Sequence, residues 1–151
     1  GLMSGERVET TSTGQISLDE ILKSGVRQAP DIDALATRGT RQAAVMVWNY
    51  QDDDLPAAGS PVQVAVSGIP AGVHRVLLEH YRIDQDHSNA YTVWKAMGSP
   101  QNPTAEQYAR LKAAGQLQLL GAPQWLTVED GKVAISTSLP RQGTSLMRLS
   151  W

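Results

Sequence analysis

Apolar residues recur at every second position in several short segments of this chain, and this alternation limits the fold more than any other feature. In VQVAVS, residues 62–67, three valines alternate with residues that are polar or small. The final segment, TSLMRLSW at 144–151, alternates in the same way. Because successive side chains of a strand point to opposite faces, each of these segments predicts a strand with one buried face.

Further segments extend this pattern. AAVMVWNY, residues 43–50, is a short, continuously apolar run with β-branched residues, which predicts a strand buried on both faces. QWLTVEDGKVAISTSL, residues 124–139, has Asp130-Gly131 at its centre, the strongest short turn signal in the chain, and predicts a hairpin. Alternating segments at 31–38 and 71–84 bring the expected total to between six and eight strands.

Helix signals are confined to short segments. Ser17 and Glu20 have the spacing of a capping box, and Gly25 can end that turn of helix. A second helix is expected to begin after Ser88 or Asn89, since both residue types accept hydrogen bonds from free backbone N–H groups at a helix start.

A third helix is expected near 104–115. Thr104 and Gln107 form another capping box, and Gly115 suits a left-handed terminating position. The segments show no alternation of strand and helix, so a parallel sheet is not expected. The predicted fold class is all-β: an antiparallel β-sandwich with a short helical insertion between strands.

The composition excludes several classes of function. The chain has 151 residues, a formal net charge of -2 and no run rich in Lys or Arg, so we expect no nucleic-acid partner. No apolar run approaches 18 residues, so no membrane span is expected, and residues 1–10 lack the apolar core of a signal peptide. Cysteine is absent, which excludes disulfides and thiolate metal sites.

The densest group of functional residue types lies in DQDHSN, residues 84–89. Asp84, Asp86 and His87 have side chains that bind metal ions, but the segment lies between a predicted strand and a predicted helix. Ser88 and Asn89 are residue types that cap helices at such a position. We therefore interpret the segment as a helix cap and predict no metal site.

Other catalytic patterns are weak or missing. The three consecutive carboxylates at 52–54 lack the alternating ligands and the glycine of a calcium loop, and predict a solvated hairpin loop. A serine hydrolase would need a nucleophilic Ser near a His. The chain has three histidines, His74, His80 and His87, but no G-x-S-x-G motif, and it has no glycine-rich phosphate loop. No cofactor is predicted.

The four tryptophans raise the question of a sugar-stacking platform. Trp48 and Trp151 lie in apolar strands, and because the chain has no Phe we assign both to the core. Trp94 has helical spacing from neighbouring apolar residues, which indicates packing. Trp125, at the start of a strand, is the candidate for an exposed sugar-stacking residue.

Three segments together resemble a known family. They are VWNYQDDDLP, HYRIDQDHSNAYTVWKAMGSPQNPTAEQYARLKAAGQL and LPRQGTSLMRLSW. Bacterial β-xylosidases of glycoside hydrolase family 39 have a segment similar to residues 81–84 and 87–89, followed by Tyr91 and Trp94. The Pro-Thr-Ala-Glu-Gln run at 103–107 and the closing strand also resemble α-L-iduronidase of that family. The resemblance covers about 31–151.

The resemblance implies a two-part enzyme. Family members combine a catalytic (β/α)₈ barrel, which hydrolyses glycosides with retention through two Glu residues, with an accessory β-sandwich. The acid/base Glu follows an Asn, and none of the six Glu residues here does so. A barrel needs about 250 residues. The resemblance therefore implies that 31–151 is the accessory sandwich, without a catalytic residue, and that 1–30 leads in from the end of a barrel.

In this interpretation the chain supports the barrel of a bacterial β-xylosidase, which would release xylose from the non-reducing end of xylosides or xylo-oligosaccharides. The candidate contacts between domains or at the rim of the cleft are then Asp84, Asp86, His87, Ser88, Asn89 and Tyr91. Two alternatives stay open: a carbohydrate-binding module that uses exposed aromatics such as Trp125, and an oligomerisation module. A soluble protein of the bacterial cytoplasm or periplasm is expected.

Overall fold

The computed structural model describes residues 1–53 and 55–151, which form nine strands and three helices. The strands are β1 (Glu6–Val8), β2 (Asp31–Gly39), β3 (Gln42–Tyr50), β4 (Ser60–Ser67), β5 (Arg75–Ile83), β6 (Gln118–Leu119), β7 (Gln124–Thr127), β8 (Lys132–Leu139) and β9 (Thr144–Ser150). The helices are α1 (Leu18–Ser24), α2 (Ala90–Ala96) and α3 (Ala105–Ala114).

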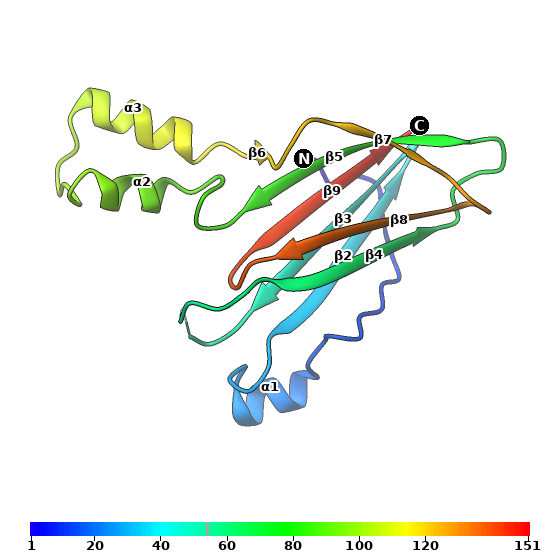
Figure 1. Ribbon diagram of the computed structural model, residues 1–151, viewed down its shortest axis with the longest axis horizontal. Helices are drawn as coiled ribbons and strands as arrows, with labels where there is room; N and C mark the ends of the chain where they lie inside the picture. Colours follow the sequence, from blue (N-terminus) through cyan, green and yellow to red (C-terminus); the bar gives the residue numbers. More distant parts are fainter. Residues whose placement is uncertain (54) are drawn as a thin grey trace.

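The strands form two sheets of unequal size (Figure 1). The large sheet has seven strands in the order β1-β2-β3-β9-β5-β6, with β7 also paired to β5. The small sheet contains β4 and β8. Every strand pair is antiparallel, and α2 and α3 are inserted between β5 and β6. The predicted all-β antiparallel sandwich with a helical insertion is confirmed.

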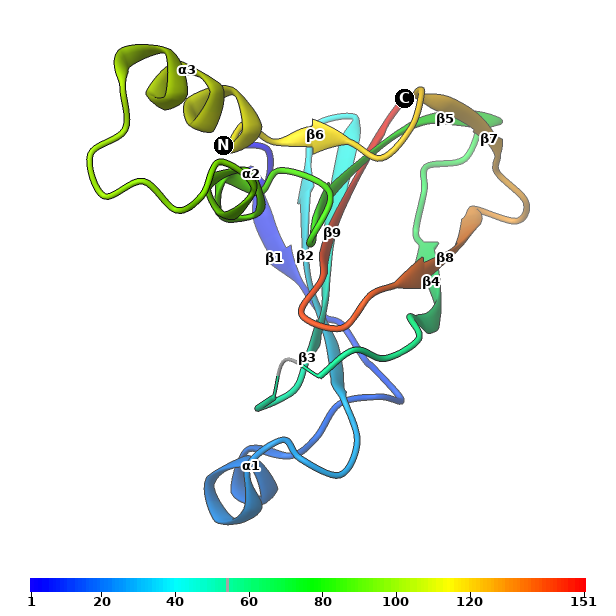
Figure 2. The same ribbon diagram turned by 60° about the vertical axis from the view of Figure 1, so that its left-hand side comes forward.

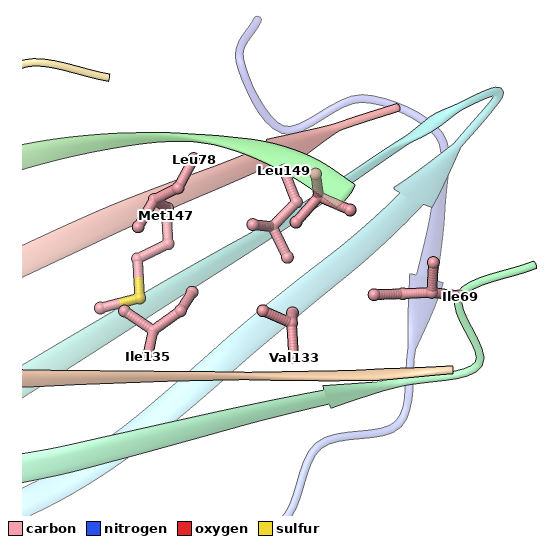
Figure 3. Packing of buried hydrophobic residues seen from close by; sticks show 7 residues of the cluster. Ile69, Leu78, Val133, Ile135, Met147 and Leu149 are labelled. Carbon is pink, nitrogen blue, oxygen red and sulfur yellow. The ribbon is translucent and has the colours of Figure 1, made fainter. Parts of the chain in front are cut away.

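The core lies between the two sheets (Figure 3). The larger cluster of buried side chains contains Ile69, Val76, Leu78, Val133, Ile135, Met147 and Leu149, and a second contains Ala36, Val45, Val47 and Leu139. In β9 the buried positions alternate as predicted, with Met147 and Leu149 directed into the core. Burial of these alternate apolar faces is the main force that holds the sheets together.

The other face of the large sheet carries a row of apolar side chains. The strand register aligns Leu35, Met46, Leu146, Tyr81 and Leu119 across five neighbouring strands. Each of these side chains is partly or largely exposed. We call this set the outer row; it faces away from β4 and β8.

The outer face corrects one prediction. Residues 43–50 were expected to be buried on both faces. Val45, Val47 and Asn49 are buried on the face toward the small sheet, whereas on the other face Ala44 is buried but Met46 and Trp48 are only half-buried. The small sheet lies on one side of the large sheet, so among the described residues no second sheet covers the other face of β3. The assignment of Trp48 to the core is also wrong, whereas Trp151 does pack against the larger cluster.

The turn at Asp130-Gly131 forms as predicted, but the hairpin does not. Both residues have positive φ, 49° and 70°, as a type I′ turn requires, and Glu129 and Lys132 exchange backbone hydrogen bonds. Beyond the turn the strands separate, because β7 pairs with β5 in the large sheet and β8 pairs with β4 in the small one. The two-residue turn therefore carries the chain across the sandwich.

The loop after β3 also differs from its prediction. It connects the large sheet to β4 of the small sheet, so it is not a hairpin loop. Asp52 accepts a hydrogen bond from the Val26 backbone N–H, and Asp53 forms an ion pair with Arg141. The third carboxylate of this run, Asp54, lies outside the described residues.

The helix ends are predicted with mixed success. Thr104 and Gln107 form a complete capping box at α3, as expected. At α1 only half of the box is present, since Ser17 accepts from the Glu20 N–H without a reciprocal bond. Gly115 has φ -82° and is not in the predicted left-handed conformation.

The segment before β2 is hydrogen-bonded along the large sheet. β1 pairs with β2, and Gly14 forms a bridge with Ile32. The Thr10 hydroxyl donates to the Ala34 carbonyl, and the Ile16 N–H donates to the Asp31 carboxylate. Residues 6–16 therefore lie along β2 instead of extending away from it.

The helices α2 and α3 project from the sandwich as an arm (Figure 1). Neither helix has a buried residue. Figure 2 shows the arm on the side of the large sheet opposite to β4 and β8, the side of the outer row. The arm and the outer row thus border the same side of the molecule.

We expect Gly131→Ala to lower the free energy of unfolding by about 1–2 kcal/mol, because a side chain at its φ of 70° is strained. Its Cβ would also lie 3.2 Å from the Ile69 carbonyl oxygen. Urea denaturation measures the loss. The control is Gly121→Ala, whose Cβ meets nothing within 4 Å; equal stability losses in the two variants would contradict a strained turn.

Candidate functional site

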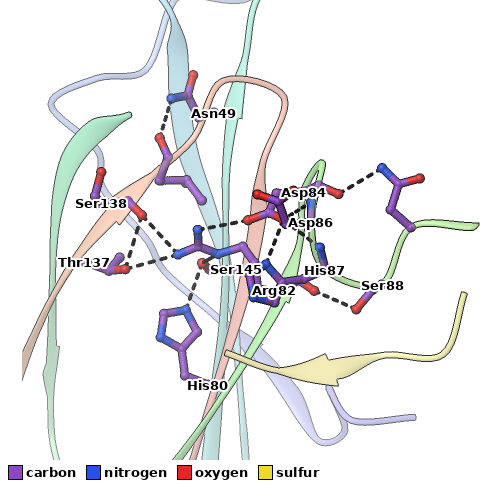
Figure 4. A network of polar contacts seen from close by, with 12 residues as sticks. Asn49, His80, Arg82, Asp84, Asp86, His87, Ser88, Thr137, Ser138 and Ser145 are labelled. Atoms are coloured by element: carbon purple, nitrogen blue, oxygen red, sulfur yellow. Dashed lines mark hydrogen bonds and ion pairs between the residues drawn. The ribbon is translucent and has the colours of Figure 1, made fainter. Parts of the chain in front are cut away.

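The segment 84–89 forms a compact loop around one carboxylate (Figure 4). The Asp84 Oδ1 atom accepts hydrogen bonds from the backbone N–H groups of Asp86 and His87, both at 2.8 Å. The His87 Nδ1–H donates to the same oxygen at 2.9 Å. The Asp84 side chain is only 7% exposed, so its carboxylate organises the loop from within.

Ser88 and Asn89 connect this loop to the arm. Ser88 has φ 53°, and its hydroxyl donates to the Arg82 carbonyl and accepts from the Gln118 N–H. Asn89 is the N-cap of α2, because its Oδ1 accepts from two backbone N–H groups of the first turn. Its Nδ2 donates to the Asp84 carbonyl at 2.9 Å. Together the two side chains hold both ends of the arm against β5.

Arg82 lies at the centre of the surrounding network and is 3% exposed. Its guanidinium donates to the Ser145 hydroxyl on β9 and to the Thr137 hydroxyl and Ser138 carbonyl on β8. It also pairs with the Asp84 carboxylate at 3.4 Å. A buried charge is tolerated only when it is paired and hydrogen-bonded, and Arg82 meets this condition while bonding to both sheets.

His80 completes the network. Its Nε2 lies 2.9 Å from the Ser145 hydroxyl, which accepts a hydrogen bond from Arg82. Because Arg82 can only donate, the Ser145 proton is free to be donated to Nε2 of a neutral His80. Burial and the nearby charge of Arg82 lower the pKa of His80 from 6.5 to about 4. The imidazole is therefore neutral near pH 7.

The Asp84 carboxylate is held in its charged form. Burial acts to raise its pKa, but hydrogen bonds from the His87 side chain and from the backbone of Asp86 and His87 outweigh burial and lower it. With one oxygen accepting three hydrogen bonds and the other paired to Arg82, it has little capacity left for a substrate or a metal.

The remaining candidate residues are more accessible. Asp86 is exposed, and Tyr91 is 62% exposed and stacks on Trp94 with ring centroids 5.7 Å apart. Within residues 1–53 and 55–151, no three His, Asp or Glu side chains come together as a metal site would require. The arrangement suits a rigid connection between β5 and the arm, with accessible side chains beside it. The absence of a metal stays a prediction.

Sequence reasoning identified the loop but missed its partners. Arg82, Thr137 and Ser145 were not among the candidates, although Arg82 is in phase with the buried Val76 and Leu78 on β5. That phase was a usable signal, because an Arg on the buried face of a strand must find partners inside. Thr137 and Ser145 had no comparable signal, since their proximity depends on how the sheets pack.

Trp125 is located apart from this network, on β7. It is 58% exposed, and the Arg75 guanidinium lies over one face of its ring at 4.9 Å from the centroid. A cation over the ring is a stabilising contact that occupies one of its two faces. The predicted exposure of this tryptophan is confirmed, whereas its role in binding sugars stays a prediction.

Solved structures share this fold. A GH39 enzyme from Xanthomonas axonopodis pv. citri superposes with a TM-score of 0.66 at 19% identity, over 78% of this chain and 25% of that chain. A monomeric β-xylosidase from Caulobacter crescentus CB15 gives 0.64 at 18% identity, over 87% of this chain and 29% of that chain. At these identities the likeness establishes the fold of the sandwich.

The sequence comparison identifies the family. Residues 16–130 match Glycosyl hydrolases family 39, and the chain belongs to this family. The α-L-iduronidase of Mus musculus is 29% identical over 89 residues, which are 54% of this chain and 14% of that protein. The chain thus spans between 14% and 29% of the lengths of these relatives.

None of the helices within residues 1–53 and 55–151 is both long and apolar enough to cross a bilayer.

We expect Asn89→Ala to lower the free energy of unfolding by about 1–2 kcal/mol, because the first turn of α2 loses its cap and Asp84 loses a donor to its carbonyl. Thermal and urea denaturation would measure this loss. Asn102→Ala, at an exposed position between the two helices, is the control and should change stability little. A loss at Asn102 as large as at Asn89 would argue against the capping role.

The lowered pKa of His80 predicts a pH dependence. Between pH 6.5 and about 4 the unfolded chain binds a proton at this position and the folded protein does not. The contribution of His80 to stability is therefore complete above pH 6.5 and is lost as the pH falls toward 4.

We expect His80→Gln to flatten the fall in the free energy of unfolding across this range, measured by urea denaturation at a series of pH values. His74→Gln, which changes an exposed histidine immediately before the same strand, is the control. A His80→Gln profile parallel to that of the unchanged protein would contradict the assignment.

Proposed function

We propose that residues 31–151 are the accessory β-sandwich of a retaining family 39 glycosidase, and that 1–30 leads in from its catalytic barrel. The observation that carries this proposal is the outer row. It places apolar side chains from five strands on one side of the large sheet, and the described chain leaves them partly exposed. A partly exposed apolar face of this extent is typical of a surface that packs against another domain.

The arm supports the same orientation. It stands on the side of the outer row (Figure 2), and it carries the exposed Tyr91 and Tyr108. The network at Asp84 holds the base of the arm rigidly, so that it can contact a second domain without becoming disordered. In this proposal Asp84, Asn89 and Ser88 position the arm, while Asp86, His87 and Tyr91 contact the barrel or the rim of its cleft.

We further propose β-xylosidase as the activity of the whole enzyme, with xylosides or xylo-oligosaccharides as substrates. A β-xylosidase is among the structures whose fold this sandwich shares. The iduronidase similarity makes an iduronidase the competing assignment. Chromogenic xyloside and iduronide substrates, given to the whole polypeptide, would distinguish these activities.

A carbohydrate-binding module is the second candidate function. It is favoured by Trp125, whose 58% exposure leaves one ring face accessible for stacking on a sugar. Thr127, two residues further on, is exposed on the same face of this short strand, and its hydroxyl can donate a hydrogen bond to a sugar. The outer row has no part in this function, so the two candidates depend on different residues.

The docking proposal is tested by Leu146→Asp, made both in residues 1–151 and in the whole polypeptide. Leu146 is already partly buried in the sandwich alone, so we expect some loss of stability there, but less than in the whole polypeptide. In the whole polypeptide the new charge would be buried against the barrel, and we expect a loss of about 3 kcal/mol and faster proteolysis between the domains.

The matched control is Ala134→Asp, at an exposed position of β8 on the opposite side of the molecule. It should leave both polypeptides stable. If Leu146→Asp changed stability by the same amount with and without the remaining polypeptide, the outer row would not be an interdomain surface.

A further inference from the structure

One end of the large sheet carries an exposed cation over an exposed aromatic ring. The strand register pairs Arg75 with Thr127 and Leu77 with Trp125, so Arg75 and Trp125 are diagonal neighbours on one face. All three polar or aromatic members of this group, Arg75, Trp125 and Thr127, are exposed. Figure 1 shows β7 close to the C-terminus, at the end of the sheet that is remote from the arm. We call these three residues the edge cluster.

The charge of Arg75 is available to a ligand. Within residues 1–53 and 55–151 its guanidinium belongs to no ion pair, whereas Arg148 on the same face pairs with Glu79 at 3.1 Å. The guanidinium lies 4.9 Å from the centroid of the Trp125 ring. Attraction to the face of a ring uses none of the N–H donors of a guanidinium. The ring therefore holds the cation in place and leaves its donors free for an anion.

Thr127 adds a hydroxyl beside this cation. Residues directly opposite one another in an antiparallel pair have Cβ atoms about 5 Å apart, and Arg75 and Thr127 are such a pair. A carboxylate accepts hydrogen bonds at both of its oxygens, and with Arg it frequently forms two parallel bonds. The guanidinium and the hydroxyl can thus donate to the same carboxylate.

The three side chains together define the chemistry of the ligand. The indole of Trp125 offers a flat apolar surface, against which the C–H groups of a sugar ring can pack. A neutral sugar would leave the donors of Arg75 unused, and a small inorganic anion would leave the indole unused. A uronic acid uses both, because its carboxylate is attached directly to a carbon atom of the sugar ring.

We propose that the edge cluster binds a uronic acid residue of an acidic oligosaccharide. The Arg75 guanidinium and the Thr127 hydroxyl hold the carboxylate, and the Trp125 indole packs against the sugar ring. This inference rests on the second candidate function in one respect, since both require Trp125 to contact a sugar, and it adds selection for negative charge.

The edge cluster and the outer row can be occupied at the same time. Arg75 precedes Tyr81, the member of the outer row on β5, by six residues. Six residues of an extended strand span about 20 Å. A domain that covers Tyr81 therefore need not cover Arg75, and the two proposals can be tested separately.

The test is the binding of trigalacturonic acid to residues 1–151, measured by titration calorimetry and compared with the binding of its methyl ester. The ester keeps the sugar rings and removes their charge. We expect the acid to bind at least about tenfold more tightly, because only the acid forms charge-assisted hydrogen bonds. The preference should decrease as salt is added, since the site is exposed.

Variants assign the effect to individual side chains. Arg75→Gln should weaken binding of the acid about tenfold and leave binding of the ester unchanged. Trp125→Ala should weaken binding of both. Arg110→Gln, which removes an exposed cation from α3 in the arm, is the matched control and should change neither. Because all three side chains are exposed, thermal denaturation should show that each variant still folds.

Three results would overturn the proposal. Equal affinity for the acid and the ester would leave a sugar site that does not select charge, so the second candidate function would survive alone. Failure of both compounds to bind would contradict that function as well. A loss in Arg110→Gln as large as in Arg75→Gln would show a general attraction of anions to the protein. None of these results depends on Leu146, so failure of the docking proposal is distinguishable from failure here.

Discussion

The buried guanidinium of Arg82 is the interaction on which the rest of this sandwich depends. Removing a charge from water costs several kcal/mol, and only a complete set of partners offsets that cost. Those partners come from β8, from β9 and from the loop that begins at Asp84. The position of Arg82 therefore links the relative position of the two sheets to the conformation of the 84–89 loop, and through that loop to the direction of the arm.

The unequal sizes of the two sheets determine which apolar surfaces of the molecule stay exposed. The small sheet covers only part of one side of the large sheet, which leaves the outer row on the opposite side and a groove beside β4. Both surfaces carry apolar side chains that residues 1–151 leave partly exposed. A domain that packs against a barrel would bury the outer row, which agrees with membership in a family whose solved structures are three to four times as long as this chain.

The site at 84–89 shows how the same residues can resemble a catalytic centre and act as a structural joint. Asp84 and His87 lie at hydrogen-bonding distance, as an acid and a base would in an enzyme. The difference is in their other contacts, since the Asp84 carboxylate also accepts hydrogen bonds from two backbone N–H groups and pairs with Arg82, which leaves it little capacity for a substrate. Whether an Asp–His pair of this kind can act on a substrate therefore depends on how many hydrogen bonds its side chains can still form.

Local patterns in the sequence determined the strands other than the short β1 and β6. They also determined which faces of β4 and β9 turn inward, where α3 begins, and that Asn89 or Ser88 caps α2, because these features depend on residues close together in the chain. The resemblance carried by 81–107 indicated the family on the same local basis. Only the tertiary structure decided that the strands flanking Asp130-Gly131 join different sheets, that Trp48 faces outward, and that Arg82 meets Thr137 and Ser145. Those outcomes depend on which strands pair and on the unequal sizes of the two sheets, and such contacts between distant residues leave no periodic signal in the sequence.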